Sequence, residues 1–93
     1  MKGYYTVRAE APSCSQSQRM ALEAGYAREL EAILGGVDRT TELCLIAASE
    51  DAQGPARASL LQASAAATAA VRAVLQVPDD CRFSMDAWLA RDL

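Results

Sequence analysis

The chain has 93 residues, of which 52% are hydrophobic and 23% are charged, and its formal net charge is −3. This composition excludes an intrinsically disordered chain, which combines low hydrophobicity with high net charge. It also disfavours a nucleic-acid-binding protein, because such proteins usually carry a surplus of basic residues. The length predicts one domain over residues 1–93, with a strand or arm over 1–12 and a helical body over 13–93.

Residues 4–10 are predicted to form a strand. Tyr5, Val7 and Ala9 face one way and the residues between them face the other. This period of two, with aromatic and β-branched residues, is typical of a strand. The strand has no clear mate in the sequence. It could pair with a second copy, join a partner's sheet or contact residues 81–83, and the alternative is an ordered or frayed arm.

A first helix is predicted over about 14–34. Ser13 and Ser15 each start a capping-box pattern, with a glutamine three residues later. Gly35 and Gly36 supply a C-terminal stop, because glycine adopts the left-handed cap conformation at little cost. The residues of its core-facing stripe recur at helical spacing and are Leu22, Tyr26, Leu30 and Ile33.

A second helix is predicted from an N-cap at Asp38 to about residue 51. Its expected stripe consists of Leu43, Ile46 and Ala47, with neighbouring Cys44 on another face. The short apolar run over 43–48 also fits a buried strand, because periodicity cannot separate the two structures over so few residues.

Two more helices are predicted in the C-terminal half. Gly54 and Pro55 mark the start of a long helix that runs to about residue 76. A short last helix is predicted from an N-cap at Ser84, with Phe83 and Trp88 forming a hydrophobic staple. The long helix has an expected stripe of Leu60, Ser64, Ala67, Val71 and Val74.

Together these elements predict a mainly α fold, a small bundle of three or four helices with a short N-terminal strand. The alternative is an α+β fold in which residues 43–48 form a second strand. Much of the hydrophobic content is alanine, which buries little apolar surface. We therefore expect the chain to gain stability by self-association or from a partner.

Catalytic chemistry has little support in the sequence. There is no histidine, which removes the commonest general base and metal ligand. Cys14, Cys44 and Cys81 fall on separate predicted elements without the spacing of a metal site. The acidic residues Asp79 and Asp80 lack the pattern of a calcium-binding loop. The prediction is therefore a chain without enzymatic activity, cofactor or metal.

Binding has more support. On the long helix, small and polar side chains lie opposite the core stripe, and this surface lets a second backbone approach closely. The strand and the tryptophan, the latter a common interface anchor, are further candidates. The predicted partner-binding residues are Ala58, Gln62, Ala65, Ala69, Arg72, Tyr5, Val7, Trp88 and Arg91.

The predicted function is that of a small acidic protein-protein interaction module, a homodimer or a partner of another protein. A phage or mobile-element inhibitor or regulator of a host complex fits this description, and so does a bacterial accessory subunit. The alternative function is a helical accessory protein that binds a metal or ligand through its cysteines. A nucleic-acid role through Arg57 and Arg72 is disfavoured by the net charge. No signal peptide or membrane span is recognisable and the cysteines are unpaired, so we expect a cytoplasmic protein.

Overall fold

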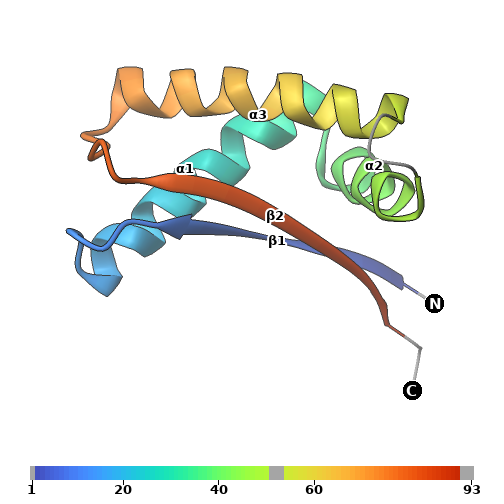
Figure 1. Ribbon diagram of the computed structural model, residues 1–93, viewed down its shortest axis with the longest axis horizontal. Coiled ribbons are helices and arrows are strands. Elements are labelled where there is room, and N and C mark those ends of the chain that lie inside the picture. The colour runs from blue at the N-terminus through green and yellow to red at the C-terminus, as the bar shows by residue number, and fades with distance from the viewer. Residues whose placement is uncertain (1, 51–53, 91–93) are drawn as a thin grey trace.

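The computed structural model describes residues 2–50 and 54–90, and side chains are described for 3–50 and 54–87. The elements in chain order are β1 (Lys2–Glu10), α1 (Gln16–Leu34), α2 (Val37–Ser49), α3 (Pro55–Val74) and β2 (Arg82–Ala90). The two strands form an antiparallel sheet, and the three helices lie on one face of it (Figure 1). The prediction of a mainly helical fold with an N-terminal strand is confirmed.

The C-terminal segment differs from the prediction, because residues 82–90 form a strand and not a helix. β2 pairs with β1 along its whole length, from Lys2 opposite Ala90 to Glu10 opposite Arg82. Side chains of β2 alternate between half-buried and exposed over 83–87, which is the period of a strand. The predicted staple between Phe83 and Trp88 is therefore wrong. Of the three mates considered for β1, contact with residues 81–83 is the correct one, and the pairing continues beyond them.

The prediction for α2 is correct in type but wrong in detail. Residues 43–48 lie within this helix, so the alternative with a second strand there is wrong. Its N-cap is Gly36, and Asp38 lies in the first turn, where a carboxylate favours the positive end of the helix. Cys44 is buried whereas Ile46 is 39% exposed, so the core stripe is rotated from the one expected.

The ends of α1 follow the local sequence signals closely. Ser15 is the N-cap of a complete capping box, and Gly35 is the C-cap with a φ of 95°. Leu22, Tyr26 and Leu30 are buried as predicted, but Ile33 is 47% exposed. The next residue, Leu34, packs against the core instead. Successive side chains of a helix lie about 100° apart around its axis. At the end of α1 the side that faces the core is occupied by Leu34, so the side chain of Ile33 is directed away from it.

The core divides into two small clusters. In the first, Tyr26 of α1 stacks on Phe83 of β2 with ring centroids 4.5 Å apart, and its hydroxyl shares a 2.6 Å hydrogen bond with Ser64 of α3. The second cluster joins α2 to the start of α3 around Leu43 and Leu60. Alanines fill much of both clusters, so the few large side chains carry most of the buried apolar surface.

The core stripe of α3 ends earlier than predicted. Leu60, Ala67 and Val71 are buried, and Ser64 is half-buried beside Tyr26. Val74, however, is 78% exposed. It is the last residue of the helix, where the neighbouring elements no longer cover it.

Candidate functional site

The backbone of β2 has a free edge whose direction can be derived from one hydrogen bond on β1. The Ala9 N–H donates to Glu23 Oε1 over 3.1 Å. The backbone N–H of Ala9 therefore points away from β2. In an antiparallel pair, residues alternate between positions that exchange hydrogen bonds and positions that do not. Ala9 faces Phe83, and therefore Phe83, Met85 and Ala87 all direct their N–H and C=O groups away from β1.

A groove of about 440 Å³ lies along this free edge. Five consecutive residues of β2, 83–87, form one wall, and no residue of β1 contributes to it. The groove is therefore on the side of β2 opposite to β1. The other wall comes from α2 and α3 and consists of Cys44, Ala47, Ala48, Arg57, Leu60, Leu61 and Ser64.

The groove combines apolar and polar groups and presents outward backbone groups of β2. Leu61, in the helical wall of the groove, is a large apolar side chain that is 65% exposed. Within residues 2–50 and 54–90, no hydrogen bond involves the outward N–H groups of Phe83, Met85 and Ala87. A strand edge with free donors and acceptors beside an apolar surface is a template for another strand.

The opposite edge of the sheet, along β1, is protected by α1. Glu23 accepts the Ala9 N–H, and the Tyr5 hydroxyl donates to Glu31 on the same helix. Carboxylates beside a strand edge discourage pairing with another chain. In the described residues, an acidic side chain of α1 therefore binds one outward N–H of β1, whereas no side chain binds an outward N–H of β2.

The predicted partner-binding residues do not form one continuous surface in the described part of the chain. The five on α3, among them Ala58 and Ala65, are all exposed. Tyr5 and Val7 lie on the inner face of β1, half-buried against the helices. Trp88 belongs to β2, but its side chain lies outside the described part, as does the whole of Arg91.

Leu61 connects the predicted α3 surface to the groove. It lies three residues after Ala58 and four before Ala65, so the three side chains are neighbours on the helix surface. In the sequence this leucine falls between the predicted core stripe and the alanine-rich surface. A leucine outside the core stripe of an alanine-rich helix is the feature of the sequence that could have indicated a binding surface here.

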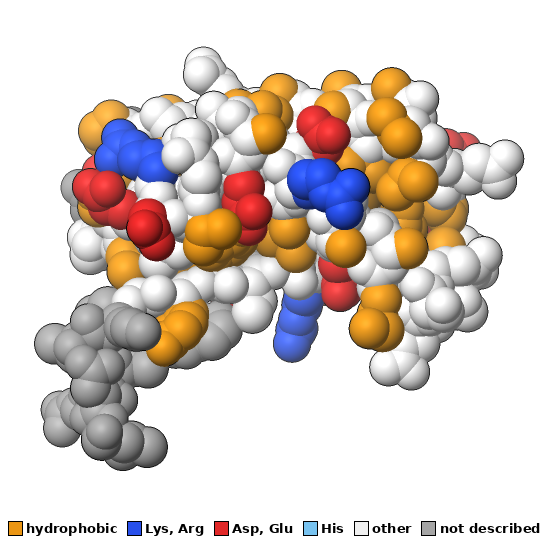
Figure 2. All heavy atoms as spheres, turned by 180° about the vertical axis from the view of Figure 1, so that it is seen from behind, with side chains coloured by type: hydrophobic (Ala, Val, Ile, Leu, Met, Phe, Trp, Pro, Cys, Tyr) orange, Lys and Arg blue, Asp and Glu red, His pale blue; other side chains and the backbone are white. Residues whose placement is uncertain are grey.

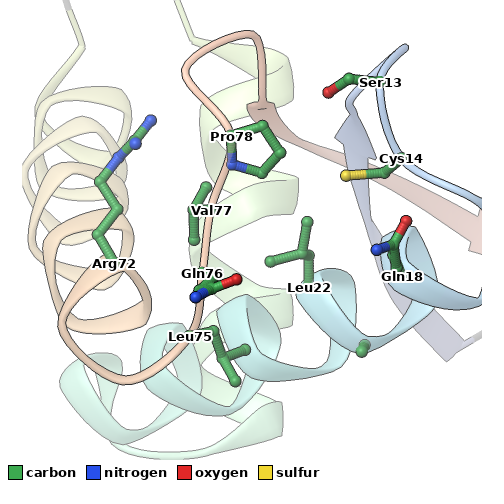
Figure 3. A pocket seen from close by; sticks show the side chains of 10 residues that line it. Ser13, Cys14, Gln18, Leu22, Arg72, Leu75, Gln76, Val77 and Pro78 are labelled. Atoms are coloured by element: carbon green, nitrogen blue, oxygen red, sulfur yellow. The ribbon is translucent and has the colours of Figure 1, made fainter.

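A second hollow, of about 690 Å³, lies between the start of α1, the end of α3 and the loop that follows α3 (Figure 3). Arg72 is its charged residue, with Gln18 and Gln76 among the polar ones. All three are exposed, and every buried side-chain polar atom in the described residues has a partner. No buried polar group is thus available to fix a ligand there.

The cysteines do not form a reactive or metal-binding centre in the described residues. Burial raises the pKa of the Cys44 thiol, and burial together with nearby Cys14 raises that of Cys81. A raised pKa leaves less of the nucleophilic thiolate at neutral pH. Nowhere in this part of the chain do three histidine, cysteine or acidic side chains gather as metal ligands would.

Raised pKa values predict that the protein loses stability in alkali. Burial, followed by the hydrogen bond to Glu31, raises the pKa of Tyr5, and burial raises that of Tyr26. Above the ordinary tyrosine value of 10.0, the unfolded chain ionises while the folded chain resists ionisation. The free energy of unfolding should therefore be flat towards neutral pH and fall as the pH rises through this value.

Urea unfolding of the reduced protein at a series of pH values from neutral to alkaline measures this effect. Tyr5→Phe removes one of the titrating groups, so its profile should fall less steeply above the ordinary tyrosine pKa. An equally steep profile in this variant would contradict the assignment to Tyr5.

One face of the molecule carries charges of both signs. On the face in Figure 2, acidic and basic side chains are interspersed among hydrophobic ones, without a broad basic region. None of the helices described here combines the length and apolar character needed to cross a bilayer. No protein-family model, curated protein or solved structure matches the chain.

Proposed function

We propose that the chain is a non-enzymatic protein-interaction module that binds an extended segment by adding it as a strand to β2. The observation that carries this proposal is the row of outward backbone groups at Phe83, Met85 and Ala87, which faces the groove between β2 and the two helices α2 and α3. Main-chain hydrogen bonds would supply affinity in this mode, and the groove would select alternate side chains of the bound segment.

Each step of the proposed binding has a counterpart in the site. A docked segment hydrogen-bonds to the β2 backbone and turns every second side chain toward α2 and α3. These inward side chains cover Leu61, which is otherwise 65% exposed. Such a module acts as an inhibitor when the segment that it binds is the one through which its partner assembles.

The alternative functions have less support. A cysteine-dependent metal site needs at least three ligands in one place, but only Cys14 and Cys81 lie near each other and Cys44 lies in the other core cluster. A nucleic-acid role needs a basic surface, and the formal net charge is −3.

Site-specific photo-crosslinking tests the proposal in cells of the native host. A photoreactive amino acid replaces Leu61 in the groove, and in a matched chain it replaces Thr6, an exposed residue on the opposite face of the sheet. We expect protein adducts from position 61 and few from position 6. Equal yields from both positions, or no adduct from position 61, would count against strand addition at this edge.

A further inference from the structure

We propose that the strand which docks on β2 is β2 of a second copy, with a two-fold axis passing through Ser84. This inference rests on the proposed function and names its partner. Two-fold pairing uses the same surface on both copies. It would join two two-stranded sheets into one of four strands, in the order β1-β2-β2-β1.

The register follows from the direction of the backbone groups. Residues whose N–H and C=O groups point outward must face one another to exchange hydrogen bonds, so odd-numbered residues of one β2 face odd-numbered residues of the other, and even-numbered residues face even-numbered ones at the positions between. The two-fold axis therefore passes through a residue and not between two residues. With the axis at Ser84, Phe83 faces Met85 of the second copy, and Arg82 faces Asp86 of the second copy.

Charge complementarity selects this axis. Arg82 and Asp86 are exposed on the outer face of the sheet, and the axis at Ser84 places each opposite its counter-charge, twice per dimer. An axis at Arg82 or at Asp86 would set like charges against each other, and an axis at Met85 would leave both residues without an opposite charge. Opposite charges stabilise directly facing strand positions, whereas like charges destabilise them.

The helical side of the interface agrees with this arrangement. A two-fold axis perpendicular to an antiparallel strand pair keeps both helical layers on the same face of the joined sheet. The two α3 helices, which form the far wall of each groove, then approach each other. The exposed leucine would be covered there, and the small side chains of Ala58 and Ala65 beside it permit close approach of the helices.

Charge reversal tests both the second copy and the register. R82D and D86R each place like charges across the proposed interface, so each should raise the dimer dissociation constant about ten-fold or more. In an equimolar mixture, opposite charges face each other again at both sites, and we expect dimers close to wild-type affinity. Sedimentation equilibrium of the two variants, alone and mixed, measures this.

A control separates this effect from damage to the sheet within one chain. Arg82 faces Glu10 across β1 and β2, so R82D also creates a like-charge pair inside the chain. E10R creates a like-charge pair at the same position without changing β2, and it should remain as dimeric as wild type. Loss of the dimer in E10R would overturn the proposed interface.

The remaining outcomes are equally decisive. A monomeric wild type, or single variants that stay dimeric, would overturn the second copy as occupant, and failure of the mixture to restore the dimer would overturn the register. The proposed function is judged separately by the adducts from position 61. An adduct of twice the chain mass supports the second copy, whereas adducts of other masses alone would overturn this occupant.

Discussion

Tyr26→Ala should destabilise the protein more than any other single truncation. The ring is fully buried, stacks on Phe83 at 4.5 Å and hydrogen-bonds through its hydroxyl to Ser64. It therefore joins α1 to both β2 and α3. Removing a buried aromatic side chain costs about 3–5 kcal/mol. The whole stability of a small domain is about 5–15 kcal/mol, so much of this variant should be unfolded at physiological temperature.

Urea unfolding followed by circular dichroism measures this loss against two other variants. Tyr26→Phe keeps the stacked ring and loses the hydroxyl, which should cost about 1 kcal/mol. Met20→Ala truncates a residue on the same helix that is 60% exposed, and it should change stability by less than about 0.5 kcal/mol. A Tyr26→Ala cost as small as that of Met20→Ala would contradict the role of Tyr26 in the core.

Much of the fold could be predicted because its signals are local. The capping box at Ser15, the stop at Gly35 and the proline at the start of α3 each act within one helical turn. The stripes of α1 and α3 are correct in their middle and fail near the helix ends, at Ile33 and Val74, whereas the stripe of α2 is rotated so that Cys44 is buried in place of Ile46. Whether a terminal residue is covered depends on where neighbouring elements stop, which the local sequence does not encode.

The error at β2 has a different cause. Over 82–87 the sequence alternates polar and apolar residues, and Ser84 followed by Asp86 also resembles the start of a helix. Pairing with β1, about 80 residues away in the sequence, decides between the two structures. Distant contacts of this kind override local propensity.

The candidate site could be predicted only in part. The exposed surface of α3 around Ala58 and Ala65 was found from helical spacing alone. The open edge of β2 could not be found, because its direction depends on which residues of β1 and β2 exchange hydrogen bonds. Tyr5 and Val7 are predicted to bind a partner through their strand, but in the structure both side chains lie half-buried against the helices.

Met85→Pro should abolish binding at the β2 edge while leaving the fold largely intact. Proline has no N–H, and the N–H of Met85 points outward, so the pairing between β1 and β2 loses no hydrogen bond. A docked strand does lose one, and the proline ring obstructs its approach. One lost hydrogen bond costs about 1 kcal/mol, and steric repulsion adds to this cost. We therefore expect the association constant for the docked strand to fall by about ten-fold or more.

Val7→Pro is the matched control for this substitution. Val7 faces Met85 directly across the sheet, and both side chains are half-buried on the inner face. By the same alternation the Val7 N–H also points outward, but toward the edge beside α1. The two prolines therefore impose similar costs on the fold and differ in the edge that they block.

The deciding measurement is the yield of protein adducts from the photoreactive group at position 61 in chains carrying Met85→Pro or Val7→Pro. If the molecule works by accepting a strand on β2, the adducts disappear with Met85→Pro and persist with Val7→Pro at equal folded fraction. Adducts that survive Met85→Pro, or that are lost equally with both prolines, would show that the open edge of β2 is not where this protein binds.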